Sequence, residues 1–325
     1  MRVSVICTVK NEAHAVCRLL DSLAGQTRRP DEVVITDGGS TDGTPAILAD
    51  FAARAPFPLR VIAAPGSNIA QGRNLAIRAA TGDIIASTDA GVWLEPTWLA
   101  DLVAPFADPH VHVVSGFFVP DPQTVFETAL GATTLPAVEE VRPDRFIPSS
   151  RSVAFRQAAW EAVGGYPEWL DYCEDVIFDL DLRARFPDFG WAPTAVAHFR
   201  PRASLRAFAR QYYLYARGDG KAGLWPKRHA IRYVTYLILA PLLVALGFRR
   251  RLAWLALLGG LAAMLFTPTK RLARLTRGQP VGTRLRAAGW APIIRVTGDV
   301  AKMVGYPVGV RWRLTTRQTK HAPHA

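Results

Sequence analysis

The amino-terminal part of the chain alternates short apolar runs with segments of helical periodicity, and this alternation constrains the fold more than any other feature. The strand-like runs are residues 3–9, 32–36, 59–63 and 83–87. Between them apolar side chains recur at helical spacing, as at Val16, Leu19 and Leu23. Strands that are almost continuously apolar and are joined by helices form a mostly parallel sheet covered on both faces. The sequence therefore predicts an α/β fold.

From about residue 110 the pattern is less regular but still mixes strands and helices. We expect strands at residues 111–119, 152–155 and 193–198, and helices at 124–130, 157–163, 174–185 and 205–217. Together with the preceding elements they predict one α/β domain over residues 1–220.

The remaining residues, 221–325, have a different texture. Two apolar runs, Ile231–Phe248 and Leu252–Phe266, are separated by the basic tripeptide Arg249–Arg251. Each run makes roughly 22–27 Å of helix, close to the thickness of a bilayer core. We expect a membrane-associated hairpin over about residues 231–266.

A later segment, about residues 285–310, carries one polar stripe. Arg295, Asp299 and Lys302 fall on the same side of a helix. A helix of this kind lies in the membrane interface rather than crossing it. We therefore expect an α-helical, membrane-associated tail after the α/β domain.

The charge of the chain is divided in the same way. Residues 1–200 contain 16 Lys and Arg and 25 Asp and Glu, whereas residues 201–325 contain 23 Lys and Arg and only Asp219 and Asp299, within a net charge of +12. Such a tail favours an anionic surface, either a membrane or a nucleic acid. Because the basic residues flank apolar runs and do not form an aromatic-lined groove, we expect a membrane and no nucleic acid.

The cysteines and the amino terminus indicate the compartment. Cys7, Cys17 and Cys173 are few and irregularly spaced, which excludes a disulfide scaffold and agrees with a reducing environment. No targeting segment is expected before the first strand, because its apolar run is too short for a signal peptide.

Two acidic residues follow predicted strands directly. Asp37 ends the second strand and is followed by the turn-forming residues Gly38–Thr44, and Asp89 ends the fourth. Ligands of such sheets bind beyond the carboxyl ends of the strands, where two carboxylates suit a nucleotide and Mg²⁺ or Mn²⁺. For Asp37 the alternative is a simple β–α turn, and Asp42 is expected only to cap a helix.

An ordered set of short motifs resembles family 2 glycosyltransferases of the GT-A fold, over about residues 1–220. The motifs are Val3–Ile6 with Lys10-Asn11-Glu12, Asp37–Thr44, Gly72-Arg73-Asn74, Thr88–Gly91, Gly164–Glu168, Glu174-Asp175 and Gln211 to Arg217. The resemblance implies a Rossmann-like, mostly parallel central sheet. It also implies an inverting transfer of a sugar from a UDP- or GDP-linked donor to an acceptor hydroxyl.

The resemblance also assigns roles to residues. It implies donor binding by Lys10, Glu12, Asp37, Arg73, Asp89, Ala90, Gln211 and Arg217, and acceptor binding by Gly164, Gly165 and Tyr166. The pair Glu174 and Asp175 would supply the catalytic base. Neighbouring side chains on a helix point about 100° apart, so only one faces the acceptor, and the family pattern selects Asp175. The alternative is that both only favour the positive end of a helix.

Two departures from the family pattern concern the donor site. Gly38 and Gly91 stand where the family has a second carboxylate, and the one at position 91 is usually the direct metal ligand. We expect Asp89, together with His198, to hold Mg²⁺ or Mn²⁺, although His198 equally fits a packed, hydrogen-bonded histidine. Arg217 suits a phosphate, or else belongs to a basic juxtamembrane helix.

These features predict a glycosyltransferase whose acceptor is a lipid or a membrane-associated glycan. The alternative is a catalytically silent, membrane-anchored nucleotide-sugar-binding protein, because Gly91 weakens the metal site. Basic residues on both flanks of the hairpin place the flanks in the cytoplasm, with the catalytic domain on the cytoplasmic side of the inner membrane. The arginines at 249–251 leave a crossing hairpin and a monotopic one open, and we expect the crossing form.

Overall fold

The computed structural model describes residues 1–316, which form two compact units. The first consists of Met1–Asp121 and Ala137–Phe199, and the second of Pro122–Pro136 and the chain from Arg200 onward. The sequence placed the boundary near residue 220. The structure groups α8 (Leu205–Ala222) with the later helices, because α8 packs along α12 (Val281–Thr316).

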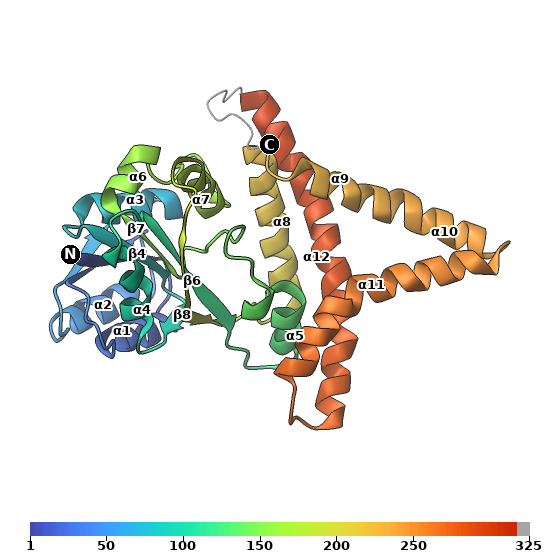
Figure 1. Ribbon diagram of the computed structural model, residues 1–325, viewed down its shortest axis with the longest axis horizontal. Coiled ribbons are helices and arrows are strands. Elements are labelled where there is room, and N and C mark those ends of the chain that lie inside the picture. Colours follow the sequence, from blue (N-terminus) through green and yellow to red (C-terminus); the bar gives the residue numbers. More distant parts are fainter. Residues whose placement is uncertain (317–325) are drawn as a thin grey trace. The chain divides into compact units, whose positions relative to one another are not determined.

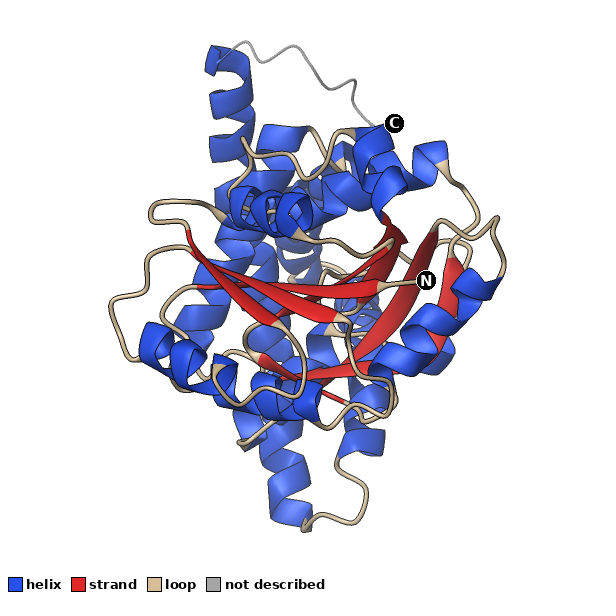
Figure 2. Cartoon of the chain, turned by 90° about the vertical axis from the view of Figure 1, so that its left-hand side faces the viewer, coloured by secondary structure: helices blue, strands red, loops and turns tan. Residues whose placement is uncertain are grey.

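The first unit is built on a mixed sheet of eight strands (Figure 2). They are β1 (Val3–Val9), β2 (Glu32–Asp37), β3 (Leu59–Ala63), β4 (Ile84–Asp89), β5 (Val92–Leu94), β6 (Val113–Pro120), β7 (Val153–Arg156) and β8 (Gly190–Phe199). Their order is β3-β2-β1-β4-β7-β6-β8-β5. The first four are parallel as predicted, and β7 reverses the direction by pairing antiparallel with both β4 and β6. The sheet is therefore parallel in the half that the alternating pattern predicted and mixed in the other half.

Helices cover both faces of this sheet, as expected. On one face lie α1 (Val16–Ala24), α2 (Thr44–Ala52) and α4 (Trp98–Val103), and on the other α3 (Ile69–Ala79), α6 (Gln157–Val163) and α7 (Glu174–Arg185) (Figure 1). Single 3₁₀ turns span Ala104–Ala107 and Val138–Glu140.

Strand β1 shows why both faces are needed. Its side chains alternate, so that Val3, Val5 and Cys7 join one buried cluster while Ile6 joins the other. A strand that is apolar on both sides is stable only between two layers of helices.

The second unit is helical. Besides α8 and α12 it contains α5 (Val125–Thr134), α9 (Pro226–Val234), a π-helical turn (Thr235–Leu239), α10 (Ala240–Gly247) and α11 (Arg251–Leu275). Its core combines Leu130, Phe208, Leu272 and Ile294. The backbones of α8 and α12 approach each other so closely that a Cβ at Gly309 would collide with the carbonyl oxygen of Arg217. Glycine is required there.

One residue of the polar stripe on α12, Asp299, is buried inside the second unit, and the interfacial position of the helix stays a prediction. Asp299 is 7% exposed, and its carboxylate is bound by Arg232 at 2.7 Å and by the Tyr236 hydroxyl at 3.0 Å. Arg295 lies 3.5 Å from the same carboxylate. Asp299 thus faces α9 and the π-helical turn, because a buried carboxylate needs partners.

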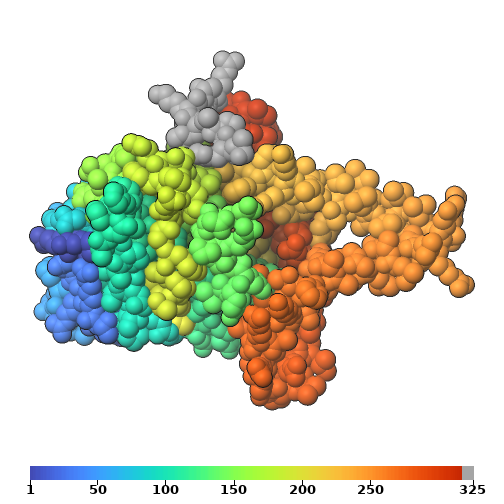
Figure 3. Space-filling model, viewed as in Figure 1, coloured from blue at the N-terminus to red at the C-terminus, as the bar shows by residue number. Residues whose placement is uncertain are grey.

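Two segments form the predicted hairpin. Pro226–Gly247, with a mean hydropathy of 1.8, and Arg251–Leu275, with 1.7, are long and apolar enough to cross a membrane, by length and composition. They converge on a tip that projects from the rest of the second unit, where α10 packs on α11 (Figure 1 and Figure 3). Leu242, Leu255 and Leu258 on these segments are exposed.

A buried amide fixes the loop that leads towards α7. Asn74 on α3 is 3% exposed. It donates to the carbonyl of Tyr166 at 2.8 Å and to Glu168 at 2.9 Å, and it accepts from the Tyr166 amide at 2.9 Å and the Trp160 indole at 3.1 Å. This single side chain therefore connects α3, α6 and the following loop.

We predict that Asn74→Ala destabilises the first unit by about 2–4 kcal/mol, because it leaves the Trp160 indole and the Tyr166 amide buried without partners. The control is Asn68→Ala, which removes the amino-terminal cap of the same helix at a cost of about 1 kcal/mol. Thermal unfolding of the detergent-solubilised chain measures both. Equal shifts in the two variants would contradict the role of Asn74.

Candidate functional site

The ends of three parallel strands meet at one edge of the sheet. In the β1–β2 ladder Val9 pairs with Asp37, and in the β1–β4 ladder Thr8 pairs with Asp89. The two carboxylates therefore lie on either side of the end of β1, as the parallel order predicted. Lys10, the residue directly after β1, is exposed at the same edge.

Asp37 shapes the turn that follows it. Its Oδ1 accepts hydrogen bonds from the Gly39 amide at 3.0 Å and from the amide and hydroxyl of Ser40, both at 2.8 Å. Gly39 has a φ of +90°, which only glycine adopts readily. Among the described residues Oδ2 of Asp37 has no hydrogen bond, so one oxygen holds the turn while the other stays available to a ligand.

Asp42 is not the helix cap that the sequence predicts, because Gly43 is the N-cap of α2 and offers no side chain. Its carboxylate accepts hydrogen bonds from the amide and hydroxyl of Thr44 and from the Ala13 amide. It organises the start of α2.

Arg73 joins three elements of the first unit through its guanidinium group. Nη2 donates to Asp89 Oδ1 at 2.8 Å, and Nη1 donates to Glu174 Oε1 at 2.7 Å. The side chain is 4% exposed and lies over the Tyr166 ring, 5.3 Å from its centre. A buried cation between two carboxylates locks the end of β4 to the start of α7.

The surroundings of Asp89 and Glu174 shift the pKa values of these two carboxylates in opposite directions. Burial opposes ionisation of Asp89, but the charges of Arg73 and Arg151 outweigh it and hold the pKa of Asp89 below its usual value. Burial and the neighbouring Asp175 raise the pKa of Glu174 to about 7 against the opposing charge of Arg73. Glu174 is 6% exposed. This corrects its predicted catalytic role, because a carboxylate buried against Arg73 does not reach an external hydroxyl.

Asp175 is the accessible member of the acidic pair. It is half-buried, and its Oδ1 accepts from the Val176 amide at 2.9 Å in the first turn of α7. One turn along the helix, Asp179 is 2% exposed, and burial together with Asp175 raises its pKa well above the usual value. Asp175 is thus the only carboxylate of Glu174, Asp175 and Asp179 that is neither fully buried nor bound by Arg73.

The residues at the expected metal position do not fit a divalent cation. Asp89 is one carboxylate, with Arg73 on Oδ1 and Arg151 Nε 3.6 Å from Oδ2. Gly91 contributes no side-chain ligand, and a Cβ there would meet nothing within 4 Å. Residues 1–316 contain no cluster of three or more His, Cys, Asp or Glu that could hold a metal ion.

The structure also contradicts the expectation that His198 holds a metal together with Asp89. Its Nε2 lies 2.7 Å from Glu95 Oε1, and its ring stacks on Trp93 at 3.7 Å between centres. It is the packed, hydrogen-bonded histidine that the sequence had left open.

The motif assigned to the acceptor has a structural role. Gly164 and Gly165 both have a φ of +80°, and a Cβ at Gly165 would lie 2.8 Å from Asn74 Oδ1. Tyr166 is 1% exposed and stacks on Phe178 at 4.0 Å, and burial raises its pKa. The structure therefore corrects the prediction that the Tyr166 side chain contacts an acceptor.

The structure shows where the other predicted donor residues lie, but their contacts do not bear on donor binding. Glu12 is half-buried, and its amide donates to Thr44 Oγ1. Ala90 is 4% exposed in the turn after β4. Gln211 and Arg217 lie on α8 in the second unit, where Gln211 donates to the Tyr215 hydroxyl at 2.7 Å. Their donor contacts stay predictions.

The sequence analysis missed Arg151. In the β4–β7 ladder Ser87 pairs with Val153, which places Asp89 opposite Arg151 just beyond the ladder. The Thr88 hydroxyl also donates to the Arg151 carbonyl at 3.1 Å. Only the antiparallel pairing with β7 reveals this neighbour.

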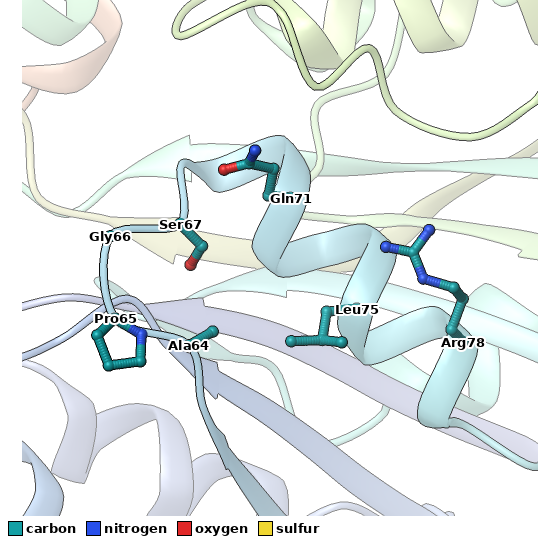
Figure 4. Close-up of a pocket in the computed structure, with 7 residues that line it drawn as sticks. All are labelled: Ala64, Pro65, Gly66, Ser67, Gln71, Leu75 and Arg78. Atoms are coloured by element: carbon teal, nitrogen blue, oxygen red, sulfur yellow. The ribbon is translucent and has the colours of Figure 1, made fainter.

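A shallow hollow of about 470 Å³ lies where the loop after β3 meets α3 (Figure 4). Pro65, Gly66 and Ser67 form one side, and Gln71, Leu75 and Arg78 on α3 the other. It contains none of the predicted site residues.

Comparison with known proteins agrees with this geometry. Residues 4–160 match the model of Glycosyl transferase family 2. The glycosyltransferase AglE of Haloferax volcanii is 28% identical over 173 residues, which cover 52% of this chain and 57% of AglE. The chain spans about a third of the length of two further curated relatives.

Two solved structures share the fold. The mannosyltransferase PcManGT of Pyrobaculum calidifontis, in complex with GDP-Man and Mn²⁺, is 22% identical, with 98% of this chain and 88% of PcManGT covered at a TM-score of 0.57. TarS 1–349 of S. aureus, in complex with UDP, is 19% identical, with 99% of this chain and 93% of that one covered at a TM-score of 0.50. The chain therefore contains a glycosyltransferase family 2 domain over residues 4–160 and has the GT-A fold.

Proposed function

We propose that this chain transfers a sugar from a UDP- or GDP-linked donor to an acceptor hydroxyl, with inversion at the anomeric carbon. The observation that carries the proposal is the pair of hydrogen bonds made by Arg73. They hold Asp89 at the edge of the sheet where β1, β2 and β4 end, and they bind Glu174. Asp175, the next residue, stays accessible. The structural neighbours in complex with GDP-Man and UDP support a nucleotide-linked donor.

Each residue of the site then has a defined task. The unengaged oxygen of Asp37 receives a hydrogen bond from the base at the end of β2, and Asp89 accepts from the ribose. Asp175 accepts the proton of the acceptor hydroxyl as its oxygen attacks the anomeric carbon. The bond from that carbon to the diphosphate oxygen breaks, and the electron pair leaves with the diphosphate. Basic side chains stabilise that departing charge.

The helical unit supports a membrane-associated acceptor, either a lipid or a glycan. Apolar side chains along the hairpin are exposed, and an apolar surface of this length is stable in a bilayer. Basic residues lie at the outer ends of the hairpin, Lys227 and Arg228 at the start of its first segment and Arg271 and Arg274 near the end of its second. Under the positive-inside rule both flanks are cytoplasmic, which puts the first unit on the cytoplasmic side of the inner membrane.

A catalytically silent nucleotide-sugar binder is the second candidate, and Gly91 favours it. The missing carboxylate removes a ligand that catalysis uses in the resembling family. Loss of transfer in a variant that still binds nucleotide separates the two candidates.

We predict that Asp175→Asn lowers sugar transfer by about 100-fold or more, because an amide cannot accept the acceptor proton. Nucleotide binding stays unchanged, since the proposal assigns the base to Asp37 and the ribose to Asp89. Transfer from radiolabelled nucleotide sugars to a membrane extract measures the first quantity, and calorimetric titration with UDP and GDP measures the second. Asp188→Asn, an exposed carboxylate beyond α7, is the control and retains transfer. Full transfer by Asp175→Asn would remove Asp175 as the base.

We also predict that the hairpin crosses the membrane. Arg249→Cys, made with Cys17→Ser, reacts with a membrane-impermeant thiol reagent in intact spheroplasts, because three arginines left in the hydrocarbon cost several kcal/mol. Cys7 and Cys173 are buried and stay in place. The control, Arg277→Cys after α11, reacts only after permeabilisation. Reaction of the tip only after permeabilisation would indicate a monotopic hairpin.

A further inference from the structure

Two arginine side chains, Arg73 and Arg151, lie beside Asp89, at the position where the family that this chain resembles binds a metal. The Asp89 carboxylate has Arg73 Nη2 at 2.8 Å on one oxygen and Arg151 Nε at 3.6 Å from the other. A divalent cation on Asp89 would lie beside two guanidinium groups and would displace at least one of them. Gly91 offers no second carboxylate to offset that repulsion.

The two arginines are held differently. Arg73 is 4% exposed and is committed to Asp89 and Glu174, which closes it to a ligand. The Arg151 side chain is 24% exposed, and its contact with Asp89 is an ion pair longer than a hydrogen bond. It is the arginine at this edge that a diphosphate can reach.

Aromatic rings and the backbone aim the Arg151 guanidinium. It lies 4.5 Å from the centre of the Phe199 ring and 5.9 Å from that of Phe118, within the range of cation–π attraction. Its Nη1 donates to Ser149 Oγ at 3.1 Å, and its carbonyl accepts from Thr88. The group is therefore positioned beside Asp89 before any ligand arrives.

We propose that Arg151 binds the donor diphosphate in place of a divalent cation, so that this chain binds its nucleotide without metal. The proposal rests on the proposed function. A guanidinium presents a planar pair of donors that matches two phosphate oxygens. When the bond between the anomeric carbon and the diphosphate oxygen breaks, the charge that develops on that oxygen faces Arg151.

The first test measures metal binding without nucleotide. Titration of Mn²⁺ into the full chain, followed by electron paramagnetic resonance, is expected to show no bound Mn²⁺ that Asp89→Asn removes. Gly91→Asp is expected to create such a site and to tighten Mn²⁺ binding about tenfold or more, because a second carboxylate completes a hard-oxygen pair. The open space around position 91 allows the aspartate to fit without strain. A wild-type site that Asp89→Asn abolishes would overturn the proposal.

The second test measures nucleotide binding by titration calorimetry with UDP and GDP, in excess EDTA and in Mn²⁺. The affinity of the wild-type chain is expected to agree in the two conditions within about threefold, and Arg151→Gln to weaken it about tenfold or more while Arg151→Lys loses less. Arg145→Gln, an exposed arginine whose neighbour is Asp144, is the matched control and leaves affinity unchanged.

The outcomes separate the two proposals. Binding that falls tenfold or more in EDTA, or an Arg151→Gln variant that binds normally, would overturn the role of Arg151 and leave the proposed function standing. Absence of UDP and GDP binding in every condition would overturn the proposed function and this inference with it.

Discussion

The first unit depends on a buried cation. Moving the Arg73 guanidinium out of water costs several kcal/mol, and two carboxylates, the buried Glu174 and the partly exposed Asp89, offset that cost. None of the three is stable there alone. Their mutual requirement holds the end of β4, the middle of α3 and the start of α7 in one arrangement, and the site inherits its geometry from them.

That arrangement explains why two neighbouring acidic residues have different roles. Glu174 points inward to Arg73, and Asp175, about 100° further around α7, is half-buried and accessible. The ion pair thereby orients the proposed base, because any rotation of α7 that withdrew Asp175 would also break the contact between Glu174 and Arg73. Asp179, on the same helix, is buried, which leaves Asp175 as the more accessible of the two carboxylates.

Features that depend on local sequence and parallel topology could be predicted. Asp37 and Asp89 follow strands whose order is set by short β–α connections, so their common edge follows from the pattern alone. Features that depend on distant partners could not. Tyr166 is core because of Asn74 and Phe178, and His198 is packed because β8 pairs with β5. Asp299 on α12 is buried because Arg232 and Tyr236, more than sixty residues earlier, satisfy its carboxylate.

Arg151 belongs to the same class, since an antiparallel pairing across more than sixty residues brings it to Asp89. Its presence makes sense of Gly91 in terms of charge. Two carboxylates with one divalent cation carry no net charge, and Asp89 with Arg151 carries none either, the pair of Arg73 and Glu174 being common to both arrangements. In the proposed reaction the departing diphosphate would therefore meet a site of the same total charge in both arrangements. Glycine instead of aspartate at position 91 therefore removes a metal ligand but leaves the net charge of the site unchanged, provided that Arg151 lies opposite Asp89.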